Sequence, residues 1–73
     1  MSIQKYGSSG PDTELLQKAL SRSGRKLTID GIFGNSTKNA LLSFQASRGL
    51  ATDGIAGTAT WRALTPYLTG YIT

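Results

Sequence analysis

The chain alternates between stretches that place apolar residues at helical spacing and stretches rich in glycine. In the first helical stretch the apolar side chains recur at intervals of one, three and four residues: Leu15, Leu16, Ala19 and Leu20. This spacing predicts a helix over Pro11–Ser23 with one apolar face. Pro11 suits the first turn, where its missing N–H costs nothing, and Gly24 is typical of the position just past a helix end.

A second helix is predicted to begin at Asn35 or Ser36, because either side chain can cap the free N–H groups of a first turn. It ends before Gly49. Its apolar face comprises Ala40, Leu41, Phe44 and Ala46. The spacing of these residues is again that of an amphipathic helix.

A third helix is predicted to begin with Thr58 as its cap and to be halted by Pro66, which cannot continue a helix. It carries Trp61 and Leu64. Residues 67–73 then form either a last turn packed on the bundle or a frayed end. The whole pattern predicts an all-α fold, a small three-helix bundle joined by glycine-rich loops.

The residues that lead into the second and third helices form an internal repeat at an offset of 23 residues. The first unit, residues 27–41, and the second unit, residues 50–64, are identical at eight of fifteen positions. Each unit contains a DG-x-x-G loop followed by a helix, and in each the aspartate can accept backbone N–H bonds in a turn while the first glycine adopts a positive φ. We expect Ile32 and Ile55 to anchor the loops in the core and Phe33, at the variable next position, to be exposed.

Composition favours a binding module over an enzyme. The 73 residues form one domain, 1–73, with an expected core over 6–65 and a C-terminal turn or tail over 66–73. The chain has no cysteine and no histidine and only four carboxylates, so it lacks a plausible nucleophile and base. Asp30 and Asp53 occupy equivalent repeat positions, where each holds its own turn. We therefore expect no catalytic residue, no metal and no cofactor.

Charge adds a preference for anionic partners. Eight basic against four acidic residues give a net charge of +4. The bases are scattered, which argues against nucleic acid, and no apolar run is long enough for membrane insertion. The N-terminus has no secretory signal. We expect a monomer that is cytoplasmic or reaches its site of action by another route.

Several motifs, in order, resemble the peptidoglycan-binding domain type 1. They cover about residues 6–64 and consist of Leu16-Gln17, the loop from Asp30 to Thr37, Phe44-Gln45, Gly49-Leu50, and the loop and helix from Asp53 to Leu64. The resemblance implies a three-helix module with an internal repeat that binds bacterial cell wall without catalysing a reaction. Such modules accompany murein hydrolases, transpeptidases, phage endolysins and injection particles, so the implied site of action is the bacterial wall or periplasm. For a chain without a secretory signal, the resemblance implies delivery by a phage or a larger particle, or an excised domain.

Peptidoglycan offers hydroxyls, N-acetyl groups and stem-peptide carboxylates, which polar side chains, an aromatic ring and a base can bind. The expected ligand-binding residues are Asp30, Phe33, Asn35, Ser36, Lys38 and Trp61. Trp61 is either a sugar platform or a core residue, and Gln17 and Gln45 either hold the loops or contact ligand.

The alternative function is a protein–protein interaction module that keeps the same bundle. An exposed apolar patch formed by Trp61, Tyr67 and Ile72 would favour it.

Overall fold

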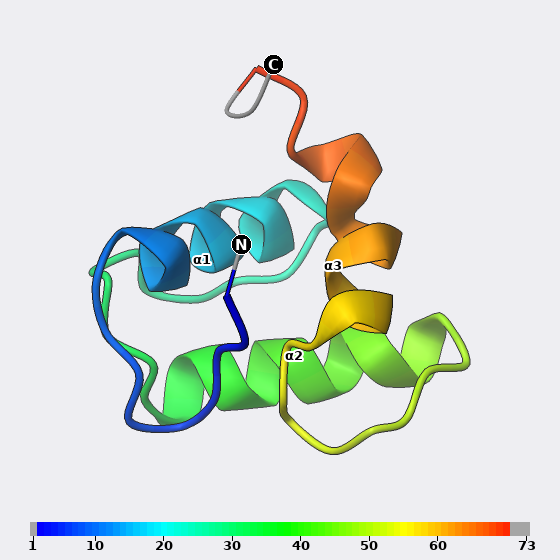
Figure 1. Ribbon diagram of the computed structural model, residues 1–73, viewed down its shortest axis with the longest axis horizontal. Coiled ribbons are helices and arrows are strands. Elements are labelled where there is room, and N and C mark those ends of the chain that lie inside the picture. The colour runs from blue at the N-terminus through cyan, green and yellow to red at the C-terminus, as the bar shows by residue number, and fades with distance from the viewer. Residues whose placement is uncertain (1, 71–73) are drawn as a thin grey trace.

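Three α-helices follow one another in the computed structural model, which describes residues 2–70. They are α1 (Pro11–Arg22), α2 (Asn35–Ser47) and α3 (Thr58–Leu64), and a 3-10 turn, η1 (Thr65–Tyr67), continues α3. Helices α1 and α2 lie one above the other, and α3 stands across one end of the pair (Figure 1). The described residues contain isolated β-bridges but no strand, so the all-α three-helix prediction is confirmed.

The helix starts differ from the prediction in how they are capped. Each helix begins directly after a glycine, and none of the three starts has a side-chain cap. Asn35 and Thr58 are the first helical residues, and the Ser36 hydroxyl accepts a bond from the backbone N–H of Thr28 (3.2 Å). The predicted caps are therefore wrong, because the glycine before each helix occupies the position from which a side chain would cap it.

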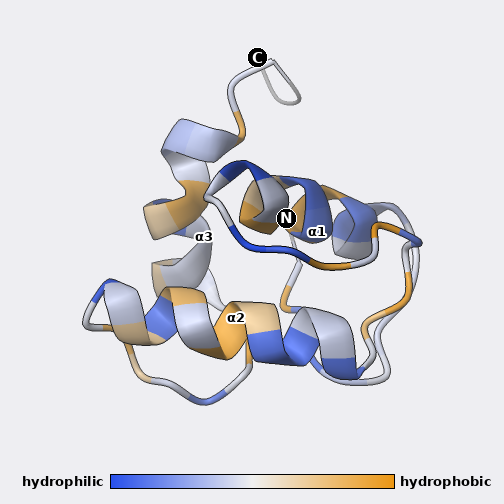
Figure 2. Ribbon diagram, turned by 180° about the vertical axis from the view of Figure 1, so that it is seen from behind, coloured by the Kyte–Doolittle hydropathy of each residue, from blue (hydrophilic) through white to orange (hydrophobic). Residues whose placement is uncertain are grey.

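The core is buried at the centre of the three helices, and Figure 2 shows apolar positions of α2 on the side toward α1 and α3. Its buried apolar members are Leu16, Ala19, Leu20, Phe33, Ala40, Leu41, Phe44, Ala56, Trp61, Leu64 and Leu68. Ala46, which was assigned to the apolar face of α2, is exposed. The core thus draws on all three helices, both repeat loops and the residue after η1.

Within the two loops, burial is the reverse of the sequence prediction. Phe33 is 1% exposed and Ala56 is fully buried, whereas Ile32 is 60% and Ile55 is 40% exposed. In the first loop the backbone of Phe33 is bonded on both sides: its N–H donates to Ser8 (2.8 Å) and its carbonyl accepts from Gly7 (3.0 Å). In an extended segment neighbouring side chains point to opposite faces, so pairing Phe33 in this way turns its ring inward and the side chain of Ile32 outward.

The N-terminal segment, residues 2–10, contacts both loops. Gln4 pairs with Ala56 and Ser9 with Ile32 in antiparallel bridges. The buried Gln4 also accepts a hydrogen bond from the Thr13 hydroxyl in α1. This segment therefore ties the loop of the first unit, the loop of the second unit and the start of α1 together.

The residues after α3 pack on the bundle as far as Leu68, which is fully buried. The rings of Tyr67 and Phe44 meet edge to face, with 6.4 Å between their centroids. Arg48 donates a hydrogen bond to the Tyr67 hydroxyl (2.5 Å). Of the patch that would favour a protein partner, Trp61 is buried, Tyr67 is half-buried in these contacts, and Ile72 lies outside the described residues.

Candidate binding site

Gln17, fully buried in α1, holds the loop of the first unit. Its side-chain NH₂ group lies within hydrogen-bond distance of Asp30 Oδ1 (3.0 Å), the Ile32 carbonyl (3.0 Å) and Thr37 Oγ1 (2.9 Å). Its Oε1 accepts from the backbone N–H groups of Asp30 (3.0 Å) and Gly31 (2.8 Å). This one side chain therefore joins α1, the loop and the first turn of α2.

Gln45 in α2 makes the same arrangement in the second unit. Its NH₂ group approaches Asp53 Oδ1 (3.0 Å), the Ile55 carbonyl (3.0 Å) and Thr60 Oγ1 (3.1 Å), and its Oε1 accepts from Gly54 N–H (3.0 Å). Both glutamine side chains are satisfied inside the fold, which accounts for their burial. The interpretation of these amides as loop-holding groups is confirmed, and they are not available to a ligand.

The two loop aspartates also serve their own turns. The backbone N–H of Ile32 donates to Asp30 (2.9 Å), and that of Ile55 donates to Asp53 (2.9 Å). These backbone bonds are the largest cause that lowers the pKa of each carboxyl below its ordinary value of 3.8, and the glutamine amides lower the pKa further. Each carboxylate is thus held ionised within its loop.

Acid is expected to weaken the fold through these carboxylates. Because their pKa values are lower in the folded chain than in the unfolded one, the stability they add is present above about pH 4 and is lost as pH falls through the folded pKa. The free energy of unfolding in urea should be nearly constant from about pH 7 to about pH 5 and decline below about pH 4.

The matched control is the double variant Asp30→Asn, Asp53→Asn. Its amide oxygens can still accept the backbone N–H bonds but do not titrate. Its stability should decline less steeply in acid than that of the parent chain. An equally steep decline in both proteins would show that other groups cause the acid sensitivity.

The sequence-predicted residues of the first unit are only partly brought together. Asn35, Ser36 and Lys38 are exposed on the first turn of α2, and Asp30 is linked to the same turn only through Gln17. Phe33 is a correction: its ring is buried against the core, so it cannot offer a face to a sugar. The first unit therefore presents a polar surface without the aromatic platform expected there.

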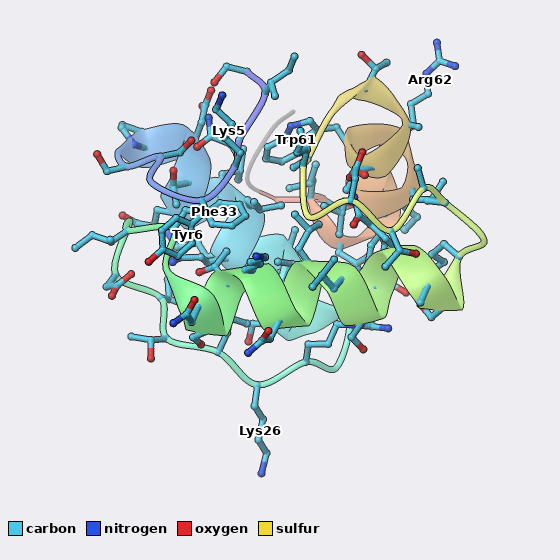
Figure 3. The ribbon with its side chains drawn as sticks, turned by 90° about the horizontal axis from the view of Figure 1, so that it is seen from below. Lys5, Tyr6, Lys26, Phe33, Trp61 and Arg62 are labelled. Carbon is cyan, nitrogen blue, oxygen red and sulfur yellow. The ribbon has the colours of Figure 1, made fainter. Side chains whose placement is uncertain are left out.

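Trp61 lines a different depression, which we call the α3 groove. The groove has a volume of about 220 Å³ and is lined by Ile3, Gly57, Thr58, Trp61, Arg62 and Thr65. Trp61 is only 6% exposed, and its indole N–H donates to the Ser2 carbonyl (3.0 Å). The ring is thus fixed by the N-terminal segment and forms part of the groove wall, while Arg62 extends outward beside it (Figure 3).

A second depression, of about 190 Å³, adjoins the first, because Gly57 and Thr58 line both. Its other lining residues belong to α2, the second loop and α3: Gln45, Leu50, Ala51, Asp53, Ile55, Ala59 and Thr60. The two hollows therefore meet at the start of α3.

Comparison with known proteins identifies the family. The family model described as "Putative peptidoglycan binding domain" matches residues 9–64. The chain belongs to this peptidoglycan-binding family. Its members among curated relatives include the zinc D-Ala-D-Ala carboxypeptidase of Streptomyces albus G, 46% identical over 61 residues, and the N-acetylmuramoyl-L-alanine amidase CwlL of Bacillus licheniformis, 41% identical over 66 residues.

Solved structures give the same result. The Burkholderia AP3 phage endolysin is 42% identical, superposes with a TM-score of 0.86 over 88% of this chain, and is covered over 25% of its own length. The SleB N-terminal domain is 38% identical with a TM-score of 0.85, and the match covers 89% of this chain and 90% of that one. The alignments span 24% of the carboxypeptidase and 18% of the amidase, so this chain corresponds to the peptidoglycan-binding domain and not to the rest of those enzymes.

Residues 2–70 hold no group of three or more His, Cys, Asp or Glu side chains placed to bind a metal ion. In the same range no helix combines the length and apolar character needed to cross a bilayer.

Sequence reasoning missed five of the six residues that line the α3 groove: Ile3, Gly57, Thr58, Arg62 and Thr65. Ile3 is distant in sequence and joins the groove only through the N-terminal segment, so no local pattern could have indicated it. Thr58, Arg62 and Thr65 share a face of the third helix and its continuation with Trp61, and that spacing was the available signal.

Proposed function

We propose that this peptidoglycan-binding domain is a wall-targeting module that holds an attached or accompanying hydrolase, or a phage or injection particle, on the bacterial wall. The proposal draws on relatives whose names identify them as a D-Ala-D-Ala carboxypeptidase, muramoyl-alanine amidases and a phage endolysin. In this role the chain binds and another part of the assembly performs the chemistry.

The observation that carries the proposal is the surface across the start of α3. It combines an apolar wall of Trp61 and Ile3 with the hydroxyl of Thr58 and the guanidinium of Arg62. Methyl groups of N-acetyl or lactyl units can pack on the wall, hydroxyls can bond to sugar or amide groups, and the cation can meet a stem-peptide carboxylate. The first-unit surface with Asp30, Asn35, Ser36 and Lys38 remains the competing site.

Charge supports capture by an anionic wall. Arg25 and Arg48 both lie over the Phe44 ring with 5.2 Å to its centroid, and Arg22 donates to the carbonyl of Thr69 (2.7 Å) near the same end of the bundle. Surface charges attract a polyanion over about 30 Å at about 0.01 M salt and over about 10 Å at about 0.1 M salt. Binding to native wall should therefore weaken with added salt more than binding to wall stripped of anionic polymer.

A sedimentation assay with purified, polymer-stripped sacculi tests both the function and the site. The variant Thr58→Ala, Arg62→Gln is compared with Asn35→Ala, Lys38→Gln, which makes chemically matched changes and removes the same charge in the first unit. We expect the second-unit variant to bind about five to ten times more weakly, the effect of losing an ion pair and a hydrogen bond, and the first-unit variant to bind within about twofold of the parent.

Failure of the parent chain to co-sediment at low salt would overturn the proposed function. Loss of binding in the first-unit variant alone would place the ligand on α2 and leave the function intact.

A further inference from the structure

The internal repeat provides a comparison between a helix face that the chain covers and one that it leaves open. On α2, the face formed by Lys38 and Leu42 is covered by Gly54 of the second loop. Gly54 is buried, and a Cβ added to it would lie 3.6 Å from Leu42 Cδ2 and 3.7 Å from Lys38 Cγ. The α2 face therefore receives a residue that has almost no side chain.

The backbone of that residue has a particular conformation. Gly54 has a φ of +72°, which L side chains rarely adopt and which glycine and D residues adopt readily. The α2 face thus binds a small residue in the left-handed region.

The equivalent positions of the second unit, 23 residues further on, are Trp61 and Thr65. Both line the α3 groove, so the groove lies at the place where a third loop would lie. At the position equivalent to Gln45 the chain has Leu68, which is buried in the core and has no amide with which to hold a loop. The N-terminal segment covers part of this face, because Ser2 bonds the Trp61 indole and Ile3 lies beside it, and within residues 2–70 the rest of the face is the open groove.

We propose that the α3 groove binds a peptide that ends in a small D-amino acid with a free carboxylate, in the manner in which α2 receives Gly54. This inference rests on the proposed function and specifies which part of peptidoglycan is bound: the stem peptide and not the glycan. A D residue at a φ near that of Gly54 is unstrained.

The charge and size of the groove agree with such a ligand. Arg62 is the only charged residue that lines it, and no described carboxylate pairs with its guanidinium. The Thr65 hydroxyl donates to the Trp61 carbonyl (3.2 Å), which leaves its oxygen free to accept a peptide N–H. At about 220 Å³ the groove is below the range of about 300–1,000 Å³ typical of pockets for drug-sized ligands, so it suits one or two small residues.

The test is a titration with three probes: N-acetyl-D-Ala-D-Ala, its L,L enantiomer and its C-terminal amide. Backbone amide shifts and the fluorescence of Trp61, the only tryptophan, report the site. We expect the D,D peptide to bind about tenfold more tightly than its enantiomer, because an L residue is strained at positive φ. We expect the amide to bind about fivefold more weakly than the D,D acid, because it lacks the ion pair with Arg62.

Two variants with the same net charge separate the site from a general charge effect. Arg62→Ala should lower the affinity for the D,D peptide about fivefold. Lys26→Ala should leave this affinity unchanged, because Lys26 projects from the opposite side of the molecule (Figure 3). Shifts should concentrate at Gly57, Thr58 and Thr65.

Equal affinity for the two enantiomers, no binding of the D,D peptide at millimolar concentration, or shifts confined to Asn35, Ser36 and Lys38 would each overturn the inference. Sedimentation with sacculi is scored separately. A chain that binds sacculi but not the D,D peptide retains the proposed function and loses this inference.

Discussion

Replacing Phe33 with alanine is expected to lower the free energy of unfolding by about 3–5 kcal/mol, the range for removing a buried aromatic side chain. The ring is 1% exposed and belongs to the core. For a chain of this length the total stability is about 4–11 kcal/mol, so a loss of this size removes a large part of the total. Urea denaturation followed by circular dichroism gives the value.

The neighbouring substitution Ile32→Ala is the control. Ile32 is 60% exposed, so its truncation should cost less than about 1 kcal/mol. Comparing the two variants tests the register of the first loop, because a slip of one residue would exchange the buried and exposed positions of the two side chains. A larger loss for Ile32→Ala than for Phe33→Ala would contradict the burial described here.

Replacing Gln17 with leucine is expected to lower the free energy of unfolding by about 3 kcal/mol. Leucine has a similar volume, so the loss comes from the groups left without partners: the N–H groups of Asp30 and Gly31 and the hydroxyl of Thr37. The loss of protection should be greatest in the first loop, so hydrogen exchange at Gly31 should accelerate more than exchange in the middle of α2.

The exposed Asn39, changed to leucine, provides a control for an added apolar side chain on a helix. It should alter stability by less than about 0.5 kcal/mol. Gln45→Leu should behave like Gln17→Leu but accelerate exchange at Gly54. If both glutamine variants change the free energy of unfolding as little as Asn39→Leu does, the amide networks contribute little and the loops are held by other contacts.

The helices were predictable because their signals are local. Apolar spacing, Pro11 and the glycines after α1 and α2 fix helix bounds within one or two residues, since each acts on the turn in which it lies. The loop interiors were not predictable in the same way. Phe33 and Ile32 are both apolar and adjacent, and only the pairing of Phe33 with Ser8, 25 positions away, decides which of them enters the core.

The candidate site was predictable only in part for the same reason. Trp61 stands out as the single tryptophan, but the groove beside it is completed by Ile3, from the opposite end of the chain. The repeat indicated equivalent loops and correctly suggested structural roles for Asp30 and Asp53. It did not reveal that Gly54 covers one helix face while the N-terminal segment and a groove occupy the equivalent face of α3, which requires the three-dimensional arrangement.

The N-terminal segment has a consequence for cooperativity. Its Ser2 carbonyl holds the Trp61 indole across 59 residues of sequence, and Gln4 pairs with Ala56 in the loop just before α3. Ser2 and Gln4 both precede residue 9, where the family match begins. Local opening of the segment would therefore remove one wall of the groove while α1 and α2 stayed formed, so the shape of the groove depends on contacts between residues that are far apart in the sequence.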